Sequence, residues 1–320
     1  MVKFLEMREK LKATHYAALC IYGNDAWLKR KGIANVCDAY GIVDDGFSVD
    51  RLESPTLESI RFACFTPSMF CSTKLVVCEN FVFSEGPSKL ADTKKQIADI
   101  IRQSDGSFCL VFVSDTDKHF ADISGMETVD CNRLDKGNVV RWIVAYGKQN
   151  KVAIDNISAD RIATYCLLDM ARVSVETQKL IDYGSVSIDA IDALVHKDAE
   201  YAVYDLSSAI AAKNAARALE IYRGLVARGE DNRALFALIY NFYRRVYYVK
   251  TSSLEPAALA TALGVKQGAV SFARDTAAKY KAMQLKRALD YLAQADERLK
   301  AFVDEGEVMN ILIMQLVALQ

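Results

Sequence analysis

Short apolar runs punctuate the first part of the chain. Residues 17–23 (AALCIYG), 75–81 (LVVCENF) and 108–115 (FCLVFVSD) are nearly uninterrupted and have the length of a buried strand, and 129–134 (VDCNRL) is a fourth candidate. Helical spacing is found in DTKKQIADIIRQSDG, and in GNDAWLKRKGIANVCDAYG, which Asn24 or Asp25 can cap. Strands that alternate with helices predict a doubly wound parallel sheet, so we expect an α/β domain over residues 1–139.

Helical periodicity replaces this pattern after residue 139. Ser158, with Asp160 in the first turn, is the expected N-cap of one long helix, ADRIATYCLLDMARVSVETQKLIDYG, and SIDAIDALV follows as a shorter helix. A small all-α domain is therefore expected over residues 140–204.

A third domain, again all-α, is expected over residues 205–320. Its helices begin with DLSSAIAAKN, AARALEIYRGLVARG and NRALFALIYNFYRRVYYVK, and three more follow. Pro256 just inside one helix start and Gly264 just past its end agree with the usual preferences at helix termini. In NFYRRVYYVK the apolar positions form one helical stripe, so the aromatic residues are expected in a core with Arg244 and Arg245 at its edge.

The composition is that of an ordinary globular protein with an uneven charge distribution. Its 320 residues are 52% hydrophobic and 25% charged, enough for two or three domains with their own cores. Residues 1–204 hold 24 Lys/Arg against 29 Asp/Glu, a balance of −5, whereas 205–320 hold 16 against 12, a balance of +4. The basic C-terminal part is compatible with an anionic partner, although most such excesses are an ordinary solvated surface.

Cysteine placement and the chain ends indicate a cytoplasmic protein. All eight cysteines precede residue 167, none has CxxC spacing, and most stand in apolar runs, as buried thiols of a reducing compartment do. The start, MVKFLEMREKLK, lacks an apolar signal core, and the C-terminal run VMNILIMQLVAL is too short to span a bilayer.

The turn after the first strand is where a sheet of this kind would hold nucleotide phosphate. A phosphate loop, G-x-x-x-x-G-K-[ST], needs glycines for close backbone approach and a lysine for the phosphate oxygens, whereas this turn reads YGNDAWLKRKG. The next apolar strand ends with only Glu79 and Asn80 for magnesium and water. An unusual nucleotide site would use one of three nearby cations, but we interpret them as exposed helix charges: Lys29, Arg30 and Lys31. No cofactor is expected.

Neither metal-ligand nor nucleophile chemistry is indicated. The three histidines are far apart, and no Ser/His/Asp or Cys/His arrangement can be argued, so no catalytic residue is expected. Asp115, Asp117 and Asp122 cluster after a strand and could bind a hard cation, but turn and capping carboxylates show the same pattern. No metal site is therefore assigned.

Residues 66–74 (TPSMFCSTK) place Met69 and Phe70 side by side at an expected helix end. Adjacent helical residues point about 100° apart, so the two side chains cannot face one core. Either the segment is buried on several sides, or the pair is presented to a partner's pocket.

A second segment, LATALGVKQGAVSFARDTAAKY, is similar to a helix-turn-helix. Gly264 stands at the turn, and the second helix bears Gln267, Ser271 and Arg274. The same spacing describes any tightly packed helical corner, and the second helix is not strongly basic. A DNA-binding regulator is therefore kept as the alternative function.

Taken in order, these segments resemble the delta subunit of the bacterial clamp loader of the DNA polymerase III holoenzyme. The resemblance covers nearly the whole chain and is strongest from 158 to 300. It rests on YGNDAWLKRKG, TPSMFCSTKLVVCENF, RIATYCLLDMARVSVETQKLIDYG, YDLSSAIAAKNAARALEIYRGLVARGED and LKRALDYLAQADERLK. The third of these stretches contains an ExxKL pattern at Glu176, Lys179 and Leu180.

The resemblance implies an AAA+-like first domain, a small helical second domain, and a helical third domain that packs with sister subunits in a pentameric collar. It implies a subunit that binds the sliding clamp and helps to open it for loading onto primer–template DNA, while other subunits hydrolyse ATP. The family's hydrophobic pair falls on Met69 and Phe70, and Met keeps the volume of the more frequent Leu. Polar contacts are expected from the flanking residues Ser68, Ser72, Thr73 and Lys74.

Overall fold

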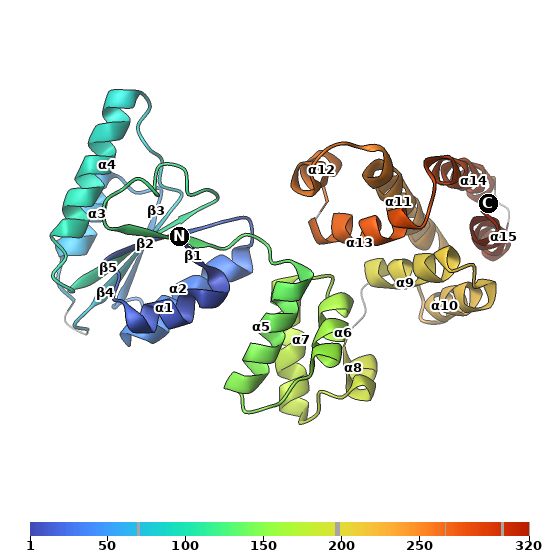
Figure 1. Cartoon of the computed structure of the whole chain (residues 1–320), viewed down its shortest axis with the longest axis horizontal. Coiled ribbons are helices and arrows are strands. Elements are labelled where there is room, and N and C mark those ends of the chain that lie inside the picture. Colours follow the sequence, from blue (N-terminus) through green and yellow to red (C-terminus); the bar gives the residue numbers. More distant parts are fainter. Residues whose placement is uncertain (69–70, 196–198, 266, 302–303, 320) are drawn as a thin grey trace. The chain divides into compact units, whose positions relative to one another are not determined.

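The computed structural model describes residues 1–319 except 69–70, 196–198, 266 and 302–303. The chain divides into two compact units, residues 1–134 and 135–320 (Figure 1). The expected boundary at residue 139 falls in the first turn of helix α5 (Lys136–Gln149), whose N-cap is Asp135. The two expected helical domains lie together in the second unit.

A six-stranded sheet forms the centre of the first unit. Its order is β1-β6-β2-β5-β4-β3, and every neighbouring pair is parallel. In the middle of the sheet, Ala18 of β2 is paired with Leu110 of β5 and Met126 of β6. The strands are β1 (Val2–Lys3), β2 (Ala18–Tyr22), β3 (Val49–Glu53), β4 (Lys74–Glu79), β5 (Phe108–Ser114) and β6 (Met126–Asp130).

Helices cover both faces of this sheet. Cys20 of β2 packs with Ile60 and Ile97 of α3 and α4, whereas the neighbouring Ile21 packs against α2 at Gly32. This alternation follows from the period of two along a strand. The helices are η1 (Phe4–Glu6), α1 (Met7–Ala13), α2 (Ala26–Tyr40), α3 (Leu57–Phe65) and α4 (Pro87–Arg102). The expected α/β domain is confirmed, including the Asp25 cap of α2.

The second unit is all-helical in its described residues. Four helices follow α11 there, where three are expected from the sequence. Its helices are α5, α6 (Asn156–Tyr165), α7 (Met170–Tyr183), α8 (Ile188–Leu194), α9 (Ala199–Ala211), α10 (Ala215–Ala227), α11 (Asn232–Thr251), α12 (Pro256–Leu263), α13 (Gln267–Ala278), α14 (Ala282–Lys300) and α15 (Glu305–Val317).

One predicted helix of this unit is wrong, because the long helix from residue 159 to 184 is in fact two helices. Asp155, not Ser158, caps the first of them, and its Oδ1 accepts hydrogen bonds from the backbone N–H groups of Ile157 and Ser158. The chain then leaves the helical conformation at Leu167 and Leu168, whose φ angles are 52° and 59°. Asp169 caps α7 in the same way as Asp155 caps α6.

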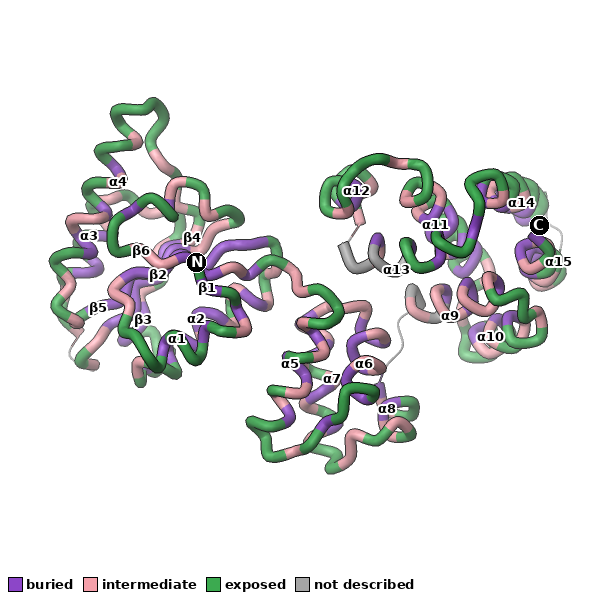
Figure 2. Tube along the Cα trace, in the orientation of Figure 1, coloured by how far each residue is buried: buried purple, intermediate pink, exposed green. Residues whose placement is uncertain are grey.

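The core of the second unit confirms the apolar stripe predicted on α11. Leu235, Ile239, Phe242, Tyr243 and Val246 are all buried there, together with residues of α9, α10, α14 and α15. Figure 2 shows that buried positions follow the inner faces of these helices. Within the described residues, no helix combines the length and the apolarity needed to cross a membrane.

Candidate functional site

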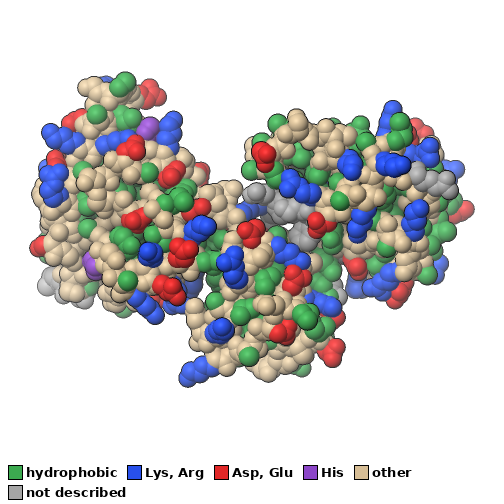
Figure 3. Space-filling view, viewed as in Figure 1, with side chains coloured by type: hydrophobic (Ala, Val, Ile, Leu, Met, Phe, Trp, Pro, Cys, Tyr) green, Lys and Arg blue, Asp and Glu red, His purple; other side chains and the backbone are tan. Residues whose placement is uncertain are grey.

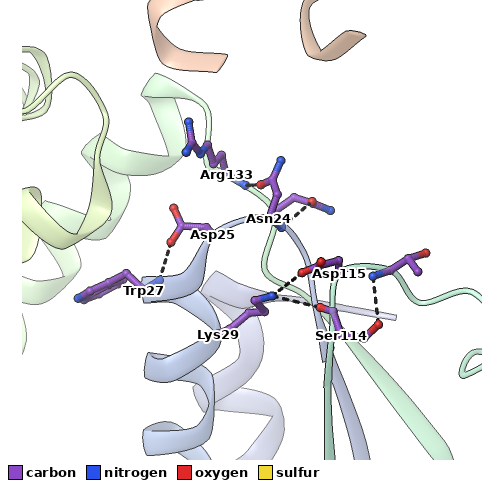
Figure 4. A network of polar contacts seen from close by, with 9 residues as sticks. Asn24, Asp25, Trp27, Lys29, Ser114, Asp115 and Arg133 are labelled. Atoms are coloured by element: carbon purple, nitrogen blue, oxygen red, sulfur yellow. Dashed lines mark hydrogen bonds and ion pairs between the residues drawn. The ribbon is translucent and has the colours of Figure 1, made fainter. Parts of the chain in front are cut away.

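The turn between β2 and α2 lies against the end of β6. Gly23 has φ +139°, and a Cβ atom there would lie 2.3 Å from the carbonyl carbon of Cys131, so only glycine is compatible with this approach. The following residue, Asn24, accepts a hydrogen bond from the backbone N–H of Arg133 at 3.0 Å (Figure 4). The turn is therefore held against the β6 terminus by the chain itself.

The start of α2 is already occupied by a carboxylate. Asp25 Oδ1 accepts hydrogen bonds from the backbone N–H groups of Trp27 at 2.9 Å and Leu28 at 3.0 Å. In a phosphate-binding turn these first helical amides point at the ligand, because a helix N-terminus presents unpaired N–H groups and a positive dipole end. Here the Asp25 side chain takes the place that an anion would need.

The lysine at the end of the first turn of α2 is also engaged within the chain. Lys29 Nζ lies 2.8 Å from Asp115 Oδ1 and 3.4 Å from the Ser114 carbonyl oxygen, both at the end of β5 (Figure 4). The interpretation of Lys29 as an exposed helix charge is therefore wrong, whereas Arg30 is exposed as expected. Because Lys29 and Asp115 neutralise each other, the lysine is not presented to a phosphate.

A cleft lies beside this turn, but its polar groups are arranged for internal contacts. It is bounded by α2 and by the segments that follow β4 and β5. Asn80 Nδ2 donates to Glu53 Oε1 at 2.6 Å, and Glu79 lies 4.0 Å from Arg51. Among the described residues no group of three or more His, Cys, Asp or Glu side chains could hold a metal ion.

The aspartates weighed as metal ligands in the sequence do not form a metal-binding group among the described residues. Asp122 pairs with Lys94 at 2.8 Å, and this lysine lowers the pKa of the Asp122 carboxyl. Asp115 pairs with Lys29, as described above. Two of the three carboxylates are therefore ion-pair partners of lysines.

The segment proposed to contact a partner, residues 66–74, follows α3 and leads into β4. Met69 and Phe70 lie outside the described residues. Ser68 Oγ donates to the Phe47 carbonyl at 3.4 Å, Thr73 Oγ1 donates to the Gly106 carbonyl at 2.9 Å, and Ser72 is exposed.

Lys74 is placed differently from these three residues. It is buried, and its Nζ lies 2.5 Å from Asp50 Oδ2 and 3.3 Å from the Ala63 carbonyl oxygen. A cation inside a fold is tolerated when it is paired and hydrogen-bonded in this way. Lys74 therefore joins β4 to β3 and α3, and its ammonium group points into the fold.

Exposed aromatic side chains lie next to this segment, a feature that the sequence analysis missed. Phe62 on α3 is 74% exposed, Phe65 at the end of α3 is 42% exposed, and Phe47 is 64% exposed. Phe65 rests edge-on against the buried Phe108, with ring centroids 5.6 Å apart. A contiguous exposed apolar patch marks an interaction surface more often than single exposed apolar side chains do. The available signal was the run FACF, which places two Phe three residues apart on one helix.

The segment that resembles a helix-turn-helix forms a packed corner of α12 and α13. Leu259 and Ala260 of α12 contact Val270 of α13, and Gly264 ends α12 in the left-handed conformation with φ +64°. Arg274 is exposed, whereas the side chains of Gln267 and Ser271 lie outside the described residues. The corner is thus explained by packing alone.

Comparisons with known proteins give one family model and several solved structures. Residues 200–316 match the family model described as DNA polymerase III delta subunit, C-terminal domain. No curated protein sequence matches the chain. Among solved structures, the Bacillus subtilis DNA clamp loader delta protein YqeN is similar with a TM-score of 0.74 and 17% identity, over 98% of this chain and 99% of that one.

Weaker structural matches include two proteins of Thermotoga maritima. A DNA polymerase III gamma subunit-related protein has a TM-score of 0.35 and 8% identity, over 99% of both chains. A variant of RuvB has a TM-score of 0.36 and 9% identity, over 86% of this chain and 84% of that one. Nothing in these comparisons favours a helix-turn-helix regulator.

Proposed function

We propose that this chain, a delta-type clamp-loader protein by its C-terminal domain and its overall fold, binds the sliding clamp and helps to hold it open for loading onto primed DNA. Its first unit would contact the clamp through residues 66–74, with Met69 and Phe70 as apolar anchors and Ser68, Ser72 and Thr73 beside them. Other loader subunits would supply ATP hydrolysis and would pack against its C-terminal domain.

The observation that best supports the clamp contact is the exposed aromatic surface of Phe47, Phe62 and Phe65. It adjoins the described first end of the 66–74 segment, where Ser68 bonds to Phe47 and Thr66 follows α3. Burial of aromatic and Met anchors at the centre of an interface commonly contributes about 2 kcal/mol or more per residue.

Both ends of the segment are attached to the sheet unit. At the first end, Thr66 Oγ1 donates to the Phe62 carbonyl at 2.7 Å. At the second end, the Lys74–Asp50 pair and the Thr73–Gly106 hydrogen bond hold the start of β4. Because an interface loses less entropy when its supporting backbone is already ordered, anchored ends favour tight binding. We therefore assign Lys74 to this anchoring.

A role without ATP chemistry agrees with the β2–α2 turn. The first amides of α2 bond to Asp25, and Lys29 bonds to Asp115, so the groups that would hold phosphate are engaged inside the chain. We propose that the remaining partners are the other loader subunits and primer–template DNA, in the cytoplasm.

Co-purification of the full chain with the sliding clamp of the same organism tests this function. We expect a complex with the clamp in the absence of ATP and of other subunits, because no step of the contact requires nucleotide. Absence of a complex, both alone and with the other loader subunits and ATP, would contradict the proposal. Specific duplex binding by the isolated chain with Arg274 essential would instead favour the regulator.

A further inference from the structure

The end of α13 and the start of α14 form a strongly basic corner, which we call the α13–α14 corner. Residues 274–287 contain five basic residues and one acidic residue, Asp275. All five basic residues are exposed: Arg274, Lys279, Lys281, Lys286 and Arg287. Figure 3 shows Lys and Arg side chains over this part of the helical unit.

Within the described residues these cations have no acidic partners, unlike Arg233 and Arg217 of the same unit. Arg233 pairs with Glu305 at 2.7 Å, and Arg217 pairs with Glu220 at 3.1 Å. Among the residues that the structure describes, none of the five cations of the corner forms an ion pair. Their positive charges are thus not neutralised by ion pairs within the described part of the chain.

The position of the corner at the start of α14 is also electrostatically unfavourable for a cation. Lys281 is the N-cap residue of α14, and the first turn of the helix contains no acidic residue. A cation at this end opposes the helix dipole, whereas an acidic group there is stabilising. A cluster of exposed cations without ion-pair partners in the described residues is suited to bind an external anion.

We infer that the α13–α14 corner contacts the phosphate backbone of the primer–template duplex. From Lys281 to Arg287 the helix rises about 9 Å at 1.5 Å per residue. A duplex carries one phosphate charge per about 1.7 Å of its axis, so about five phosphates lie within that length. Three of the five cations, Lys281, Lys286 and Arg287, lie within this length, so a duplex offers at least one phosphate to each of them, and such contacts are independent of base sequence.

This inference rests on the proposed function, since it names the surface that meets the DNA to be loaded. The test compares full-length Lys286→Gln/Arg287→Gln with a matched control, Arg223→Gln/Arg228→Gln. The control residues are exposed cations of α10 and of the position just after it, and they also lack an ion pair in the described residues. Gln favours a helix about as well as Lys and Arg do, so both variants should fold.

The measurement is the affinity of each protein for a labelled primer–template duplex over a series of salt concentrations. Loss of two phosphate contacts should lower the slope of log K against log salt by about two and weaken binding at least about tenfold near 0.1 M salt. The control should keep the wild-type slope. Equal slopes for wild type and Lys286→Gln/Arg287→Gln, or no duplex binding by the wild type at low salt, would overturn the inference.

Two further measurements separate the alternatives. If the variant loses binding to phosphatidylserine vesicles but keeps its DNA affinity, the corner binds a lipid surface and the inference is wrong. Clamp binding should be the same in wild type and variant. A wild-type chain that fails to bind the clamp contradicts the proposed function, whereas the salt slopes decide the DNA contact separately.

Discussion

Lys29 and Asp115 are 86 positions apart in the sequence, yet Lys29 Nζ lies 2.8 Å from Asp115 Oδ1 at the carboxyl edge of the sheet. This pair joins the first turn of α2 to the end of β5. Together with the Asp25 cap, it engages the donors that a phosphate-binding turn would present. The sequence lacks a phosphate loop, and in the structure the carboxylates of Asp25 and Asp115 bond to the groups that would otherwise face a phosphate.

The Asp25 cap should be a measurable part of that stability. Asp25→Ala removes the acceptor for the Trp27 and Leu28 amides and should lower the free energy of unfolding by about 1 kcal/mol. Asp25→Asn keeps an acceptor at the same position and should stay close to the wild type. Urea unfolding followed by circular dichroism gives both values. Equal urea midpoints for wild type and Asp25→Ala would show that the cap does not contribute to the free energy of unfolding.

The Lys74–Asp50 pair should contribute to the stability of the fold and should not contact the clamp directly. Lys74→Met leaves Asp50 without its partner beside a buried position, and we expect a loss of about 1–3 kcal/mol, less than for a fully buried pair because Asp50 is partly exposed. Ser72→Ala, an exposed change in the same segment, should be near neutral. Thermal unfolding of both variants checks this. A wild-type midpoint for Lys74→Met would argue against anchoring of β4 by Lys74.

Cys71 offers a native probe of the 66–74 segment. It is half-buried, whereas the other seven cysteines are buried. Burial raises the pKa of the Cys20 and Cys64 thiols to about 12, so these thiols contain little reactive thiolate near neutral pH. Iodoacetamide at pH 8 should therefore modify Cys71 first, as read by mass spectrometry of peptides. An excess of clamp should slow this reaction, and an unchanged rate in the complex would place the contact elsewhere.

Much of the fold could be predicted because its central strands are continuous apolar runs. The runs at 17–23, 75–81 and 108–115 correspond to β2, β4 and β5, which are buried on both faces. β3, in contrast, was missed. It is an edge strand in which only Val49 is buried, and its sequence VDRLE contains no apolar run.

The single long helix predicted over residues 159–184 was wrong because the chain leaves the helical conformation there without a glycine or a proline. Leu167 and Leu168 take positive φ angles between α6 and α7, a conformation that their side chains disfavour and that no local pattern predicts. The Asp169 cap was the available signal, since it precedes an amphipathic stretch.

The candidate site was predictable only in part. The missing phosphate loop and the Met69–Phe70 pair are visible in sequence, because each is a property of neighbouring residues. The burial of Lys74 and the pairing of Lys29 with Asp115 depend on strands that are brought together by the fold. Likewise, the exposed Phe62 stands in a sequence context that resembles a core helix.

The proposed clamp contact is tested most directly by the affinity of the full chain for the sliding clamp after Met69→Ala/Phe70→Ala. Loss of two apolar anchors at about 2 kcal/mol each should weaken binding at least about 100-fold while the unfolding midpoint stays unchanged. The matched control is Val175→Ala/Tyr183→Ala on α7, which removes two other exposed apolar side chains and should bind like the wild type. If the Met69→Ala/Phe70→Ala variant bound the clamp with wild-type affinity, this pair would not anchor the clamp and the proposed contact would be wrong.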